Sequence, residues 1–290
     1  MYHVQNNNKY WYSQVQETIK EALATITTGA TAVPLHLPDS DSTIIEKVEK
    51  ITDEFVLHTL TVEDLLRMSE RVKRLVEAGR VFAVQQGQDD LRYSRITLQD
   101  GQLYLHTLLR QPPPSHAHTL KHSKVMEVLD TSSTLVFLDL AWAGLIRGRV
   151  HIRLTPDTGL ATQFVWLSSG ERGPSYHNTT FFKVEYKGEP GESVTGGDYQ
   201  HNNGKGGAPL LSDQQDEYRE SGKVGAVSSP WWQGSHFSTQ FTIITRDATY
   251  NQYSNIFGEV ESGMNVLRAA VDHSNIKEVT VVDCGVVLAL

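Results

Sequence analysis

The chain has 290 residues, of which 39% are hydrophobic and 21% are charged, and its net charge at pH 7 is −8. These values are typical of a folded protein with one large or two medium domains, and they exclude a disordered chain. The charge is −3 over residues 1–130 (14 basic, 17 acidic) and −5 over the remainder (12 basic, 17 acidic). Neither part has the basic surplus that nucleic acid or an anionic membrane would favour.

Cysteine content and apolar runs bear on the compartment. The single cysteine, Cys284, excludes an intrachain disulfide and favours a reducing environment. The polar segment Met1–Tyr10 lacks the apolar core of a signal peptide. No apolar run approaches the roughly 20 residues of a membrane span. We therefore expect an intracellular protein, cytoplasmic or nuclear, with neither nucleic acid nor a membrane as partner.

The first eighty residues carry helical patterns. Apolar residues recur at helical spacing over residues 10–28, 44–55 and 65–76. Thr61 with Asp64 forms a capping pattern, and Gly79 is typical of the end of a helix. Residues 43–78 therefore predict an antiparallel helical hairpin that packs within the chain. A coiled-coil dimer is the alternative, which predicts self-association through the same helices.

Beyond Gly79 the pattern becomes that of strands. Residues 92–98 and 103–109 are joined by Asp100-Gly101, which predicts a β-hairpin. The run Gln111-Pro112-Pro113-Pro114-Ser115 is typical of a stiff linker. We therefore divide the chain into a helical module with a β-hairpin (1–110), a Pro-rich linker (111–133) and a β-rich domain (134–290).

The linker also contains His116, His118 and His122. A metal site needs further ligands on a rigid frame, and no cysteine or acidic residue follows at ligand spacing. We expect neither a metal nor a cofactor.

From Thr134 onward, alternating apolar residues predict mostly strands. Clear examples lie at residues 150–154, 181–186, 241–245 and 279–283, and two short helices are predicted at residues 157–167 and 264–271. Many strands with only two helices predict a barrel whose ends are closed by those helices. The fold class is therefore α+β with more than one domain.

Several short blocks in this domain carry a resemblance. They are Gly148-Arg149-Val150-His151-Ile152, Ser169-Gly170-Glu171-Arg172-Gly173, Gly196-Gly197-Asp198, Phe257-Gly258-Glu259-Val260, Gly263-Met264 and Val282-Asp283-Cys284-Gly285. In order and spacing, residues 134–290 resemble a cyclophilin-type peptidyl-prolyl isomerase domain. The resemblance implies an eight-stranded antiparallel barrel with a helix at each end. It also implies rotation of X–Pro amides, whose uncatalysed barrier is about 18–20 kcal/mol. We recognise no family in residues 1–130.

The positions that the resemblance makes reactive carry other residue types here. Lys183 stands where the family has its arginine, and a lysine is a point charge without the planar guanidinium fork. Of the groove residues, Gln240 is retained. The remaining replacements, at the positions of the pocket aromatics, a methionine, an anchoring glutamine and a histidine, are Glu192, Ser193, Thr195, Thr242, Tyr250 and Ser254.

These replacements predict that proline binding fails. Each apolar pocket side chain that is lost removes about 1.5–3 kcal/mol of burial. Glu192 is expected to place a carboxylate where an apolar ring should dock, and an unpaired buried charge is costly. We therefore expect no catalytic residues in this domain.

Two adjacent tryptophans, Trp231 and Trp232, precede the Gln240 strand, where related domains have small residues. We expect at least one indole to fill the vacated pocket, because an exposed pair favours aggregation. The alternative is that Trp231, Trp232 and Tyr250 are anchors for a binding partner.

Taken together, these patterns predict a non-catalytic protein–protein interaction or scaffold protein on a degenerate cyclophilin-like domain. One alternative is a weakly active peptidyl-prolyl isomerase with a remodelled groove. A second is a barrel that packs on the helical module and binds nothing through its groove.

Overall fold

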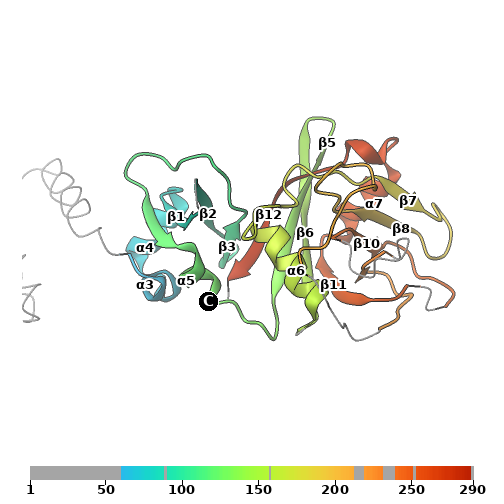
Figure 1. Ribbon diagram of the computed structural model, residues 1–290, viewed down its shortest axis with the longest axis horizontal. Coiled ribbons are helices and arrows are strands. Elements are labelled where there is room, and N and C mark those ends of the chain that lie inside the picture. Colours follow the sequence, from blue (N-terminus) through green and yellow to red (C-terminus); the bar gives the residue numbers. More distant parts are fainter. Residues whose placement is uncertain are drawn as a thin grey trace, which may run out of the picture. The chain divides into compact units, whose positions relative to one another are not determined.

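The computed structural model describes residues 60–87, 90–156, 158–211, 219–230, 239–250 and 253–288 (Figure 1). The helices predicted for residues 10–28 and 44–55 lie outside these residues, as do Trp231 and Trp232. All described residues fall within one unit, residues 57–290.

Two short helices begin the described chain, α3 (Val62–Arg67) and α4 (Glu70–Glu77). The predicted capping box is confirmed, because Asp64 N–H donates to Thr61 Oγ1 at 3.1 Å and Thr61 N–H donates to Asp64 Oδ2 at 3.1 Å. The predicted stop is also confirmed. Gly79 has φ +66°, and the N–H of Arg80 donates to the carbonyl of Leu75 at 3.0 Å, as in a Schellman motif.

The predicted hairpin is formed by β2 (Leu91–Gln99) and β3 (Gln102–His106). Asp100 and Gly101 both have positive φ, 49° and 77°, the backbone that a tight two-residue hairpin turn requires. A further strand, β1 (Val81–Gln86), pairs antiparallel with β2.

The segment expected as a linker contains regular structure in its second half. Strand β4 (His118–Lys121) pairs in parallel with β1, and α5 (His122–Met126) follows it directly. The division into domains at residues 110 and 133 stays a prediction.

The sheet differs from the eight-stranded barrel that we expected. The remaining strands are β5 (Leu135–Trp142), β6 (Leu145–Leu154), β7 (Lys183–Glu185), β8 (Ser193–Gly196), β9 (Ala226–Ser228), β10 (Phe241–Ile244), β11 (Ile256–Ser262) and β12 (Thr280–Leu288). Over the described chain they join β1 to β4 in one open, twelve-stranded sheet in the order β4-β1-β2-β3-β12-β5-β6-β11-β9-β10-β8-β7. The expectation of a closed barrel was therefore wrong.

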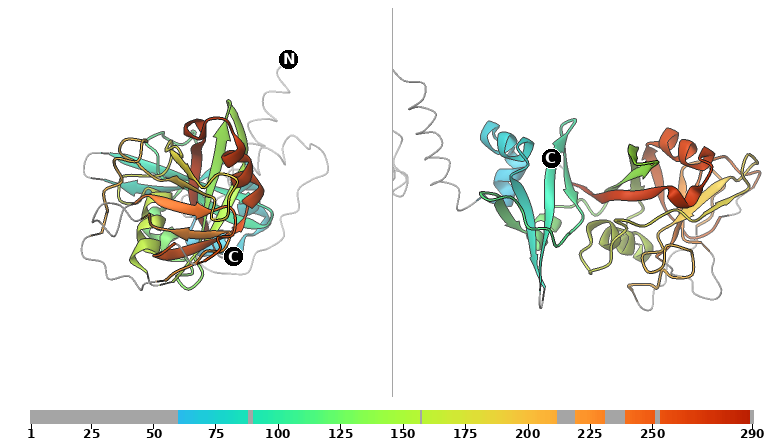
Figure 2. Two further views of the ribbon diagram at one scale, coloured as in Figure 1. Left: turned by 90° about the vertical axis from the view of Figure 1, so that its right-hand side faces the viewer. Right: turned by 90° about the horizontal axis from the view of Figure 1, so that it is seen from above.

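The sheet has more strands than we expected because one edge of β12 contacts two different segments. Its last residues, 285–288, pair antiparallel with β3, which Figure 2 shows as the red strand reaching the hairpin. Its first residue, Thr280, forms an isolated bridge with Thr180, ahead of β7. Because β3 takes the end of this edge, the sheet continues into the N-terminal strands.

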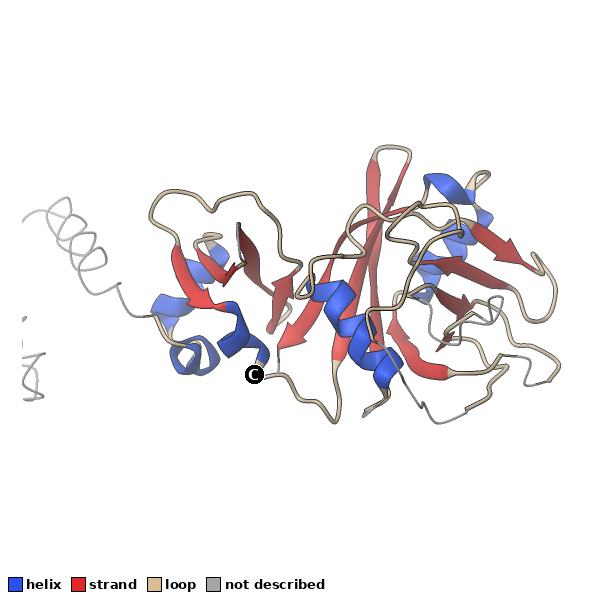
Figure 3. Cartoon of the chain, in the orientation of Figure 1, coloured by secondary structure: helices blue, strands red, loops and turns tan. Residues whose placement is uncertain are grey.

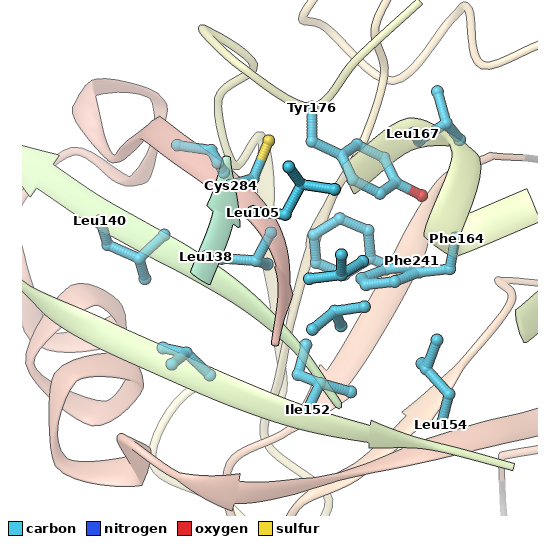
Figure 4. Packing of buried hydrophobic residues seen from close by; sticks show 14 of the residues in the cluster. Leu105, Leu138, Leu140, Ile152, Leu154, Phe164, Leu167, Tyr176, Phe241 and Cys284 are labelled. Carbon is cyan, nitrogen blue, oxygen red and sulfur yellow. The ribbon is translucent and has the colours of Figure 1, made fainter. Parts of the chain in front are cut away.

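The two predicted helices are confirmed as α6 (Gly159–Ser169) and α7 (Met264–Asp272), with a 3₁₀ turn, η2, at Ile276–Glu278 (Figure 3). Helix α6 packs Phe164 against Tyr176 and Phe241, with ring centroids 4.9 Å and 5.2 Å away (Figure 4). Leu105 of β3 belongs to the same buried cluster, so the hairpin shares the core of the sheet it extends.

Candidate binding groove

A groove of about 420 Å³ lies over the strands at the β7 end of the sheet. Its lining comes from strands β7, β8, β9 and β10 and from residues that flank them. The flanking residues are Phe182, Tyr186, Ser229, Pro230, Gln240, Tyr250, Tyr253 and Ser254. Strand pairing sets what faces the groove, because residues in register on neighbouring strands stand side by side.

One row of residues crosses the floor of the groove. Lys183 of β7 is in register with Thr195 of β8, Thr195 with Thr242 of β10, and Thr242 with Ser228 of β9. All four line the groove. The hydroxyls of Thr195 and Thr242 lie 3.0 Å apart and hydrogen bond to each other. The floor is therefore a line of polar side chains across four strands.

Lys183 does not face the groove as a lone cation. Its Nζ lies 2.5 Å from Oε1 of Glu185, and both side chains line the groove. The alternation of side chains along a strand places these two residues on one face of β7. The wall of the groove thus carries an ion pair.

Gln240 lines the groove and holds a neighbouring loop. Its Nε2 donates to the carbonyls of Gly206 at 2.6 Å and Gly204 at 3.2 Å. Asp198 fixes the same loop, because its carboxylate accepts the backbone N–H groups of Gln200, His201, Asn203, Gly204 and Gly206. Burial alone would raise the pKa of Asp198, but these donors outweigh it and hold the pKa below its usual value.

Three tyrosines stand around the groove. Tyr186 is 59% exposed and Tyr250 is 68% exposed. Tyr253 is fixed by its hydroxyl, which donates to the carbonyl of Gly191 at 2.7 Å and hydrogen bonds to Ser193 Oγ at 2.9 Å. Tyr186 has φ +51°, a left-handed backbone uncommon for a bulky residue.

Glu192 and Ser193 are not among the residues that line the groove. The Glu192 carboxylate is buried, and it accepts the N–H of Gly188 at 2.7 Å and the hydroxyl of Thr245 at 2.9 Å. Its hydrogen bonds thus join the turn after β7 to the segment after β10, and the carboxylate does not occupy the position expected for a docking ring.

The sequence that forms most of this sheet matches a known family. The family model described as cyclophilin type peptidyl-prolyl cis-trans isomerase/CLD matches residues 137–286, more than half of the chain. The chain belongs to the cyclophilin family. The matched region begins in β5 and ends in β12, so α3, α4, α5 and the strands β1 to β4 lie outside it.

Of the positions singled out from the sequence, six line this groove together: Lys183, Thr195, Gln240, Thr242, Tyr250 and Ser254. Sequence reasoning missed Glu185, Tyr186, Ser228, Ser229 and Tyr253, which line it too. The alternation along residues 183–185 could have indicated Glu185. The position of Ser228 at the groove depends on strand pairing. The position of Tyr186 depends on a turn that no local pattern predicts.

The histidines of the presumed linker lie apart from the groove. His122 is buried, and neither ring nitrogen has a hydrogen-bond partner among the described residues. Burial, with a smaller contribution from the charge of Arg92, lowers its pKa to about 4. Within the described ranges, no three His, Cys, Asp or Glu side chains are grouped to hold a metal ion. None of the described helices has the length and apolar character to cross a bilayer.

Proposed function

We propose that the groove of this cyclophilin domain binds a protein segment without turning over X–Pro bonds, so that the chain acts as an interaction or scaffold protein. The floor of the groove carries the proposal. Thr195, Thr242 and Ser228 present hydroxyls there, and a proline ring offers them neither a donor nor an acceptor. Seating the ring would desolvate these hydroxyls without replacing their hydrogen bonds, which is costly.

The charge beside the floor supports the same conclusion. The resemblance assigns catalysis to an arginine that reaches the proline nitrogen. Lys183 lacks the planar fork, and its ammonium is paired with Glu185 at 2.5 Å. Weak isomerase activity remains the competing function. This alternative is supported by Gln240, the retained groove residue. However, its Nε2 already donates to two loop carbonyls and is therefore engaged within the protein.

The exposed tyrosines at the rim of the groove, Tyr186 and Tyr250, support recognition of a protein segment. Tyrosines supply large, rigid contact surfaces at low entropic cost, and they are common among the side chains that dominate binding interfaces. Tyr186 and Tyr250 are both strongly exposed beside the groove, so their rings are available to a partner.

The compartment and the association state are part of the proposal. Cys284 is a free, buried thiol whose pKa burial raises to about 12, as suits a structural cysteine inside the cell, in the cytoplasm or nucleus. The helices that the sequence predicts over residues 43–78 are proposed to associate with a second copy or with another protein. Light scattering on the intact protein and on its Leu66→Glu variant tests self-association. If both have the mass of a monomer, the helices do not self-associate, and only binding to a different protein is left of this part of the proposal.

The experiment is a selection of random peptides displayed on phage against the intact protein. We expect enriched peptides whose binding is lost in Tyr250→Ala. The matched control is Ile146→Ala, because Ile146 is similarly exposed, at 72%, and lies outside the groove. If no peptide is enriched, or if both variants bind equally well, the proposed function is wrong.

A further inference from the structure

The floor of the groove has hydrogen-bonding capacity that the described residues do not use fully. Thr195 and Thr242 are 4% and 3% exposed, and their hydroxyls bond to each other at 3.0 Å. Since one shared hydrogen makes that bond, the pair keeps a second hydrogen to donate and lone pairs to accept. Ser229, 2% exposed, also lines the groove, and its hydroxyl has no partner among the described residues.

These hydroxyls disfavour two classes of ligand side chain. An apolar side chain would leave them desolvated and unpaired. A charged side chain would need an opposite charge at the floor. The Lys and Glu side chains that line the groove, Lys183 and Glu185, are paired with each other at 2.5 Å. A charged ligand would therefore have to break this pair to gain a counterion.

We infer that the groove selects a neutral side chain that both donates and accepts hydrogen bonds, a carboxamide of Asn or Gln, in an extended peptide. This inference rests on the proposed function and names the ligand class of the same site. A carboxamide offers two donors and one acceptor oxygen in a plane, which suits a floor of hydroxyls that can each donate or accept. The exposed tyrosines at the rim contact the residues on either side of the amide.

The probes are peptides of the form acetyl-Ala-Tyr-Gly-X-Gly-Tyr-Ala-amide with a fluorescent label, in which X is Asn, Gln, Leu, Pro, Asp or Lys. Binding to the intact protein is measured by fluorescence anisotropy. We expect the Asn and Gln peptides to bind about tenfold more tightly than the other four, the factor that one unsatisfied buried polar group produces.

The variant that removes the hydroxyls while keeping the shape is Thr195→Val with Thr242→Val. We expect it to lose the preference for Asn over Leu. Ser229→Ala, a smaller change, reduces that preference in part and serves if the double variant folds poorly. The matched control is Thr107→Val. Thr107 is equally buried but bonds to Ser175, away from the groove, so the preference should persist.

The outcomes separate the inference from the proposed function. Binding with a preference for Leu, Pro or a charged residue overturns the inference and leaves a peptide-binding groove. Binding of all six peptides with equal affinity overturns it in the same way. If none of the peptides binds while display selection succeeds, the carboxamide inference alone fails. If both experiments find no binding, the proposed function fails with it.

Discussion

The ammonium of Lys183 lies 2.5 Å from the carboxylate of Glu185, two residues further along β7. Both side chains are substantially exposed, with side-chain accessibilities of 52% and 37%, so the pair contributes little to stability, of the order of 0–1 kcal/mol. Its importance is electrostatic. At the position that the cyclophilin resemblance assigns to a catalytic arginine, the groove presents a neutralised pair and not a free cation.

The turn after β7 depends on a buried carboxylate. We predict that Glu192→Ala destabilises the protein by about 1–2 kcal/mol, because the Gly188 N–H loses its acceptor and the Thr245 hydroxyl keeps only the backbone carbonyl of residue 192. Urea unfolding measures this change. Glu189→Ala, at an exposed position in the same turn, is the control and should remain close to wild type. Equal midpoints for the two variants would contradict the assignment.

His122 makes stability depend on pH. Its pKa in the folded protein is about 4, against 6.5 for the free side chain, so folding favours the neutral ring. The contribution of the neutral ring to the free energy of unfolding is complete above pH 6.5 and is lost as the pH falls from 6.5 to 4. The shift corresponds to a loss of about 3 kcal/mol.

Chemical denaturation at several pH values, with His122→Phe as the variant, measures this effect. We expect the variant to lose less stability than wild type between pH 6.5 and 4. His116→Phe, at an exposed position, should keep the wild-type dependence. Identical pH profiles for wild type and His122→Phe would refute the prediction.

The N-terminal hairpin extends the cyclophilin sheet. Residues 285–288 of β12 pair with β3, and Asp283 accepts from His106 at 2.8 Å and from Arg95 at 3.2 Å. Burial would raise the pKa of Asp283, but the hydrogen bond from His106 and the charge of Arg95 outweigh it, and the pKa is lowered.

We therefore predict that a fragment of residues 134–290 melts at least about 5 °C below the fragment 60–290, because it loses these contacts and exposes an unpaired strand edge. Calorimetry of the two fragments makes the comparison. Equal melting temperatures would favour the division at residues 110 and 133 that the sequence predicts.

Local signals in the sequence predicted local structure well. The Thr61–Asp64 capping box and the Asp100-Gly101 turn are each set by a few neighbouring residues, so their patterns suffice. Strand β4 was missed because it is short and follows a proline run, and its pairing with β1 depends on residues far away in sequence. The pairing of β12 with β3 also joins residues that are far apart in the sequence, so no local pattern predicts it.

The candidate site shows the same limit. The family blocks located Lys183, Thr195, Thr242 and Ser254, which the structure brings together in one groove. They did not show that Ser228 continues the hydroxyl row, because that depends on the register of β9 against β10. Nor could they show where the Glu192 carboxylate points, since its partners lie in a turn and in the segment after β10.

The most direct test of the account is a measurement of X–Pro isomerisation by exchange NMR on an Ala–Pro peptide with micromolar intact protein. Uncatalysed exchange takes tens to hundreds of seconds. We predict the background rate for wild type and also for Lys183→Arg, because a guanidinium alone does not restore an apolar floor at Thr195 and Thr242. Acceleration of about a hundredfold by wild type, a change of about 2.7 kcal/mol in the barrier, would contradict the account.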